Sequence, residues 1–277
     1  MVLLYGDISP QWVNHMGTPG RKTTITFETK CYENDWEYLL KTERLKKAVA
    51  LCRYPFDRVV LHINNVKNPD KVARYASRLL LSGVISEFVQ VSDYAGQVLD
   101  SFGCGPESFG GGYYYSIAEM TAIYLCKTDY LLHFSSDTMM ANGEEWIESA
   151  IRKMEENPEI LVANPTWNDK FHRAREESVA EDGAFYIGQG FSDQCYLIAP
   201  ARFRSPIYNE KHAVTQRNFP PHGGESFEKR IDAYMRNHDY LRITSKRASY
   251  RHRNFPRNRL AKLAAISLAI ARSRLPA

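Results

Sequence analysis

The chain has 277 residues, which is enough for one large domain with a sizeable hydrophobic core. Hydrophobic residues make up 44% of the sequence and charged residues 25%, so the composition excludes a disordered or fibrous protein. The formal net charge of +4 is too small to indicate nucleic-acid binding, and we expect no nucleic-acid partner.

The cysteines argue against both a disulfide framework and a zinc site, because they are odd in number, widely spaced and contain no CxxC pair. They are Cys31, Cys52, Cys104, Cys126 and Cys195. The apolar run at residues 2–5 is too short for the core of a signal peptide, and no run reaches the length of a membrane span. These features predict a cytoplasmic protein.

Residues 1–22 hold several prolines and glycines without steady periodicity, which predicts an irregular N-terminal arm. An ordered domain is expected over residues 23–256, and strands alternate with helices through its first half, as in parallel sheets. Strands are expected at residues 23–28, 58–64, 88–91 and 130–134, and helices at about 36–45, 70–81 and 115–126.

The second half of the domain continues this pattern around one long segment without periodicity. Residues 164–190 are polar and aromatic, which predicts a long functional loop. The remaining expected elements are helices at 145–157 and 225–237 and strands at 160–163, 195–199 and 240–243. The predicted fold class is α/β, a single Rossmann-type domain with a mixed central sheet and a C-terminal helix.

The C-terminal residues 257–277 form a basic, alanine-rich segment with good helix propensity. Leucines and isoleucines in it are flanked by Arg257, Arg259, Lys262, Arg272 and Arg274. Two interpretations remain open: an amphipathic helix that rests on anionic lipid, or a helix docked on the domain or on a partner subunit.

The strand expected at residues 130–134 is followed by Ser135, Ser136 and Asp137. Ligands of α/β sheets bind beyond the carboxyl ends of the strands, so these side chains are candidates for a site. A carboxylate at such a place suits a Mg or Mn ion that also carries phosphate oxygens. The alternative is that the three residues only cap the next helix.

Three further residues follow the ends of the first strands, where doubly wound sheets hold a nucleotide. Thr29 and Lys30 follow the first strand, and Asp93 follows the strand at residues 88–91. Asp93 could bind a ribose hydroxyl or a base, or could cap the strand end together with Ser92. The glycine-rich loop at residues 103–112 has neither a GxGxxG nor a Walker pattern, and we expect a lid there.

In this order the segments resemble GT-A-fold glycosyltransferases over residues 23–255, particularly bacterial family-two-type enzymes that assemble surface polysaccharide. In that family a buried strand ends in an Asp-any-Asp motif that binds the cation and diphosphate of a nucleotide sugar. The resemblance implies that Asp137 is the metal ligand, while Ser135 replaces the first acid of the motif. His252 is similar to the late histidine that completes the metal or diphosphate site.

Residues 223–228, Gly-Gly-Glu-Ser-Phe-Glu, resemble the family's Gly-Gly-Glu-Asp-type motif, which opens a helix and supplies the catalytic base. The resemblance implies that Glu225 is this base, with Ser226 in the place of the aspartate. The structural alternative is a first-turn acid stabilised by the helix dipole. Residues 191–194 look like the loop before the strand that lines the acceptor side.

The resemblance therefore implies an inverting glycosyltransferase of the hexosyltransferase type. It would move a sugar from a nucleotide-sugar donor, expected to be UDP-linked, to a hydroxyl of a saccharide or lipid-linked acceptor in polysaccharide or glycoconjugate synthesis. The expected cofactor is Mn or Mg, and residues 257–277 could touch the inner face of the membrane. The alternatives are a retaining transferase and a nonenzymatic nucleotide- or carbohydrate-binding protein of the same fold.

Overall fold

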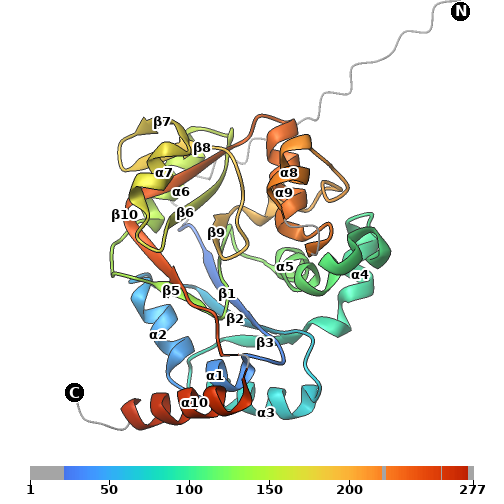
Figure 1. The fold of residues 1–277 in the computed structure, drawn as a ribbon, viewed down its shortest axis with the longest axis vertical. Coiled ribbons are helices and arrows are strands. Elements are labelled where there is room, and N and C mark those ends of the chain that lie inside the picture. The colour runs from blue at the N-terminus through green and yellow to red at the C-terminus, as the bar shows by residue number, and fades with distance from the viewer. Residues whose placement is uncertain (1–21, 220–222, 257, 274–277) are drawn as a thin grey trace, which may run out of the picture.

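The computed structural model describes residues 22–219, 223–256 and 258–273. Almost all of the expected N-terminal arm, residues 1–22, lies outside this range. A single mixed sheet runs through the described part in the order β3-β2-β1-β4-β9-β6-β10-β8-β7, with β5 paired to β10 (Figure 1). The predicted α/β class with a mixed central sheet is confirmed.

The first half of the chain builds the parallel part of the sheet, in which β1 pairs in parallel with β2 and β4, and β2 with β3. Its strands are β1 (Ile25–Cys31), β2 (Arg58–Ile63), β3 (Glu87–Gln90) and β4 (Tyr130–Phe134). Its helices are α1 (Trp36–Lys41), α2 (Arg44–Leu51), α3 (Pro69–Leu81), α4 (Ala95–Ser101) and α5 (Tyr113–Leu125), with short 3-10 turns η1 (Val91–Asp93) and η2 (Pro106–Gly112).

The second half adds strands in both directions, because β9 is antiparallel to β4 and β6 while β10 is parallel to β6. Its strands are β5 (Thr138–Met140), β6 (Ile160–Trp167), β7 (Ser178–Asp182), β8 (Phe185–Gly188), β9 (Cys195–Ile198) and β10 (Leu241–His252). Its helices are α6 (Ile147–Glu156), α7 (Phe171–Glu176), η3 (Pro200–Phe203), α8 (Ala213–Asn218), α9 (Phe227–Asn237) and α10 (Arg259–Ser273).

Hydrophobic side chains that alternate along the strands fill two cores, one on each face of the sheet. Leu132 belongs to the core under α1, α2, α3 and α6, whereas its neighbour Leu131 belongs to the core under α4, α5 and α9. Figure 1 shows α4, α5, α8 and α9 on one side of the sheet and α1, α2 and α3 on the other. Both faces are thus covered, which leaves the edge formed by the strand ends as the place for a site.

The prediction of a long loop at residues 164–190 is wrong. Residues up to Trp167 extend β6, and the rest forms α7 and the β7–β8 hairpin. β7 is the last strand of the sheet and is exposed along most of its length, so its sequence carries no alternation of apolar and polar residues. The Asp182-Gly183 dipeptide, with Gly183 at a φ of +53°, is the hairpin signal that could have indicated it.

The helix expected at about residues 36–45 is two helices, because the backbone of Thr42 is extended and its hydroxyl donates to the Tyr38 carbonyl. The last strand is longer than expected. β10 runs to His252 and uses its second half to pair with β5. This extension carries His252 to the edge at which β1 and β4 end.

The helix α10 packs against α1, and Ile266 is its buried contact. Lys262 lies 3.6 Å from the Glu37 carboxylate of α1. Three leucines of the helix are exposed: Leu260, Leu263 and Leu268. None of the helices in the described ranges is both long and apolar enough to cross a bilayer.

Candidate active site

The candidate site lies where β1, β4 and β10 end and β9 begins. Because β9 runs antiparallel to β4, the residues before it meet the residues that follow β4, and the Ser135 amide donates to the Gln194 carbonyl at 2.9 Å. The polar residues predicted after β1 and β4 are therefore joined by a segment from much later in the chain.

Asp137 and His252 meet at this edge although 115 residues separate them, and Asp137 Oδ2 lies 3.0 Å from His252 Nε2. The hydrogen bond and the charge of Asp137 raise the pKa of His252 above its ordinary value, against a smaller opposing effect of burial. The Arg253 amide also donates to the Asp137 carbonyl. Both side chains are about four-fifths buried, so the pair is held in place and still accessible.

This pair fits a cation that is shared with phosphate oxygens. Within the described ranges no group of three or more His, Cys, Asp or Glu side chains could hold a metal ion. Mg and Mn sites often use one or two protein ligands and take the rest from water and substrate phosphates. A carboxylate and an imidazole match that pattern, and the metal role of Asp137 and His252 stays a prediction.

The two serines before Asp137 tie the strand end to neighbouring segments. The Ser135 hydroxyl donates to the Asp193 carbonyl at 3.1 Å, and the Ser136 hydroxyl donates to the Asp35 carboxylate. Asp35 is fully buried, and burial raises its pKa to about 7 even though Ser136 and the Tyr32 amide donate to it. Sequence reasoning missed Asp35, because an Asp before Trp36 has the pattern of an ordinary helix cap.

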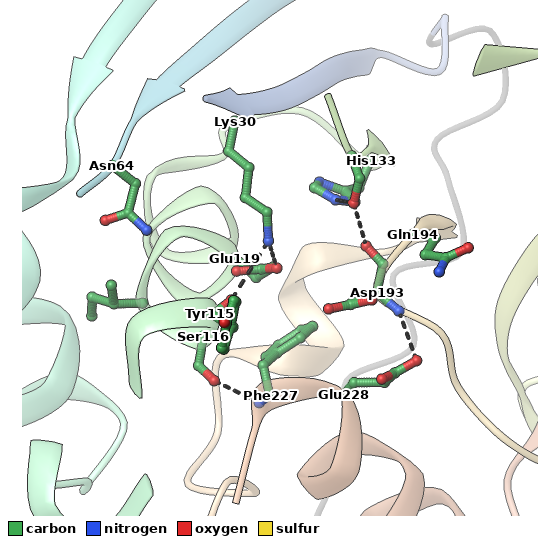
Figure 2. Close-up of polar contacts among 12 residues, drawn as sticks. Lys30, Asn64, Tyr115, Ser116, Glu119, His133, Asp193, Gln194, Phe227 and Glu228 are labelled. Atoms are coloured by element: carbon green, nitrogen blue, oxygen red, sulfur yellow. Dashed lines mark hydrogen bonds and ion pairs between the residues drawn. The ribbon is translucent and has the colours of Figure 1, made fainter. Parts of the chain in front are cut away.

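Lys30 points from β1 toward α5, where its ammonium group forms an ion pair with Glu119 (Figure 2). It also lies 3.5 Å from the Tyr115 carbonyl. Burial lowers the pKa of Lys30, while the carboxylate of Asp193 acts in the opposite direction. Glu119 is fully buried and its Oε2 has no hydrogen-bond partner among the described residues. Because side chains alternate along a strand, Thr29 points to the opposite face from Lys30.

A hollow of about 400 Å³ lies at the ends of β2 and β3. Its lining includes Asn64, Gln90, Ser92 and Tyr113. Asp93 is exposed outside this lining, and the Ser92 hydroxyl donates to it at 3.3 Å. The hollow is lined by Ser92 and not by Asp93, and the donor-binding role of Asp93 stays a prediction.

The glycine-rich segment packs against the Gly-Gly-Glu turn. Gly224 has a φ of +59°, and a Cβ atom on it would lie 2.5 Å from the Phe109 carbonyl oxygen. A Cβ on Gly112 would lie 2.6 Å from the Ser226 amide nitrogen. Both glycines are needed for this close approach of the two backbone segments. The segment predicted to be a lid contains the 3-10 turn η2, which packs against the start of α9.

The two glutamates of this turn have different surroundings. Glu225 forms an ion pair with Lys229 at 2.7 Å; burial opposes its ionisation, but Lys229 outweighs this effect and lowers its pKa. Glu228 points toward Asp193, whose amide donates to its Oε1 at 3.3 Å (Figure 2). Burial and the charge of Asp193 raise the pKa of Glu228 well above its ordinary value.

A buried charged cluster lies directly behind the site and was not predicted. Glu28 of β1 accepts a hydrogen bond from His62 of β2 at 2.9 Å and another from His133 of β4. Burial opposes ionisation of Glu28, yet the two imidazoles lower its pKa to about 2. His133 stacks on Tyr196 and lies 3.5 Å from the Ser135 hydroxyl. The polar residues at alternate positions of β1 are the sequence signal for this cluster.

Comparisons with known proteins support the fold. No protein-family model and no curated protein matches the chain. Among solved structures, GalNAc-T7, solved with UDP, GalNAc and Mn²⁺, is 9% identical with a TM-score of 0.50; the match covers 83% of this chain and 44% of that chain. Mouse xyloside xylosyltransferase 1 is 14% identical with a TM-score of 0.46, over 79% of this chain and 84% of that one.

Glucosyl-3-phosphoglycerate synthase from Mycobacterium tuberculosis, solved with Mn²⁺, UDP and glucosyl-3-phosphoglycerate, is 14% identical with a TM-score of 0.44. That match covers 92% of this chain and 83% of the synthase. The protein therefore has an α/β fold with a mixed sheet, and it is the GT-A fold of glycosyltransferases.

Proposed function

We propose that the protein is a glycosyltransferase that moves a sugar from a UDP-linked donor to a hydroxyl group of an acceptor. The observation that carries this proposal is the Asp137–His252 pair, which lies at the strand edge and close enough to Lys30 for the charge of Asp137 to act on it. A hollow lies at the ends of β2 and β3. GalNAc-T7, a protein of the same fold, was solved with UDP and Mn²⁺. A nucleoside diphosphate and a divalent cation are the ligands that this set of residues suits.

Asp137 and His252 would hold the cation, and Lys30 would meet the donor diphosphate. A Mn or Mg ion, when bound, neutralises the charge that develops on the leaving diphosphate. Ser135 and Ser136 shape the end of β4 around that position. The roles predicted for Thr29 and Asp93, contacts to the ribose and the base, stay predictions.

The reaction that we propose is a single inverting displacement. The acceptor oxygen forms a bond to the anomeric carbon, the bond from that carbon to the diphosphate breaks, and the diphosphate keeps the electron pair. A carboxylate takes the acceptor proton. The candidates for this base are Glu225, which the sequence motif predicts, and Glu228 of α9.

A saccharide or lipid-linked acceptor in surface polysaccharide or glycoconjugate synthesis is the substrate class that we propose, at the cytoplasmic face of the membrane. The support is α10, on which Leu260 and Leu268 are 77% and 53% exposed. No Asp or Glu follows Asp239 in the sequence, while Lys and Arg continue to residue 274. Exposed leucines in a basic helix suit peripheral contact with anionic lipid.

The test is a panel of nucleotide sugars with and without Mn²⁺, scored by thermal stabilisation and by release of nucleoside diphosphate. Asp137→Ala is the test variant, and Asp100→Ala, an exposed position on α4, is the matched control. We expect stabilisation by one donor that requires Mn²⁺ and disappears in Asp137→Ala alone. Stabilisation without any release would favour the nonenzymatic binding protein, and no response to any donor would reject the donor site.

A further inference from the structure

We propose that Glu228, and not Glu225, is the carboxylate that accepts the proton of the acceptor hydroxyl. This inference rests on the proposed transferase function and assigns the base within the same site. Glu228 ends the same stretch of residues 223–228, in which the resemblance assigned the base to Glu225; the contacts of the folded structure point to Glu228 instead.

Glu228 is connected to the strand end that carries Asp137. Its Oε1 accepts the Asp193 amide, and the carbonyl of the same Asp193 accepts the Ser135 hydroxyl. Glu228 is thus two hydrogen bonds away from the segment that carries Asp137. Figure 2 shows it directed from α9 toward Asp193.

The packing of α9 fixes this direction. Ser226 caps the helix and accepts the Lys229 amide at 3.4 Å. Phe227 is buried against Phe191 and Tyr196, and its amide donates to the Ser116 hydroxyl at 2.7 Å. With Phe227 held in the core, Glu228 is aimed at the loop before β9.

The surroundings of Glu228 suit proton transfer. Burial, the Asp193 carboxylate and the Asp232 carboxylate on its own helix all favour its protonated form, while the Asp193 amide and the Ser192 hydroxyl donate to it. A carboxylate whose conjugate acid is stabilised in this way is a stronger proton acceptor, and general bases work best when their pKa lies near the working pH.

Glu225 has the opposite surroundings. Its carboxylate is paired with Lys229 and accepts a hydrogen bond from Gln216. Its backbone carbonyl accepts from Arg230 at 3.0 Å. These contacts stabilise the ionised carboxylate and make it a weaker base, so Glu225 is better suited to holding the turn.

In the proposed step the acceptor O–H gives its proton to the Glu228 carboxylate while its oxygen bonds to the anomeric carbon. The bond between that carbon and the diphosphate oxygen breaks, and the electron pair leaves with UDP. The protonated Glu228 then releases its proton to water.

The experiment compares Glu228→Gln with the matched variant Glu225→Gln. UDP release is measured from UDP-glucose, UDP-galactose and UDP-N-acetylglucosamine, with water and with a panel of saccharides as acceptors, and binding of UDP with Mn²⁺ is measured separately. We expect Glu228→Gln to lower the turnover rate by about 100-fold or more, since a general base contributes about that much. Its affinity for UDP should not change, and Glu225→Gln should lose much less of the turnover rate than Glu228→Gln does.

Three results would overturn the assignment: a rate loss confined to Glu225→Gln, an unchanged rate in Glu228→Gln, or equal losses of rate and UDP affinity in Glu228→Gln. A Glu228→Asp variant guards against misfolding, and it should retain part of the activity if a carboxylate is what matters. Release of no UDP by the wild-type protein, whatever the acceptor, would reject the transferase function and this inference together. Failure of Glu228 alone would leave the transferase function standing.

Discussion

The parallel half of the sheet, β3 to β4, and the mixed half, β9 to β7, reach the same edge by different routes. In the parallel half β1, β2 and β3 are each followed by a helical element, so their ends come from local units of the chain, while β4 leads through Asp137 into β5. In the mixed half the site residues come from the loop before β9, the start of α9 and the end of β10. The part of the site built by the parallel half therefore depends on local sequence pattern, and the part built by the mixed half, which includes His252, depends on contacts between distant residues.

The buried pair of Lys30 and Glu119 gives the strongest test of the parallel half. Lys30→Met should lower the free energy of unfolding by about 3–5 kcal/mol, because it leaves the Glu119 charge buried without its partner. Urea denaturation measures this loss.

The double variant Lys30→Met/Glu119→Gln should regain most of the stability and still fail to bind UDP with Mn²⁺. If the double variant bound UDP as the wild type does, Lys30 would have only a structural role.

The Glu28 cluster tests whether the same half is held together by charge. The folded structure lowers the pKa of Glu28 from 4.5 to about 2. A shift of this size corresponds to roughly 3 kcal/mol of stability near neutral pH, and Glu28→Gln should lower the free energy of unfolding by that amount. Because the folded pKa is the lower one, this contribution is complete above the ordinary pKa and is lost as the pH falls toward 2.

The check is urea denaturation of Glu28→Gln and wild type across this acidic range, with Glu144→Gln at an exposed position as the control. The difference between Glu28→Gln and wild type should shrink as the pH falls. A difference that did not change with pH would show that packing, not charge, carries the effect.

The contact between η2 and the Gly-Gly-Glu turn tests the mixed half. Gly224→Ala should cost roughly 2 kcal/mol more than Gly83→Ala, since both glycines have positive φ but only the first would bring a Cβ atom against backbone. Thermal unfolding of both variants measures the difference. Equal losses would mean that the turn moves away from Phe109 without cost.

The exposed leucines of α10 should give the smallest effect. Leu260→Ser/Leu268→Ser should weaken binding to phosphatidylglycerol vesicles by about tenfold, because less apolar surface enters the lipid. Leu81→Ser, at an even more exposed leucine on α3, is the control and should bind as the wild type does. Cosedimentation measures binding, and absence of wild-type binding would reject the membrane contact.

Much of the architecture could be predicted from local pattern. The buried runs at residues 58–64 and 130–134 became β2 and β4, and the amphipathic stretch at residues 70–81 became α3, where Asn68 caps the first turn. Helix and strand periods are properties of neighbouring residues, so they are visible before folding. The GT-A fold, expected from the order of these segments, is confirmed.

The chemistry of the site depended on contacts between distant residues. The sequence alone determined that Asp137 follows a buried strand and that His252 comes late in the chain, and the resemblance paired them. The Glu225–Lys229 ion pair is a local i,i+4 pair. Folding alone brought Glu228 to Asp193 and Glu28 to two histidines. The reason is physical: whether a carboxylate is paired with a cation, buried or free to take a proton depends on neighbours that folding brings from other strands and helices.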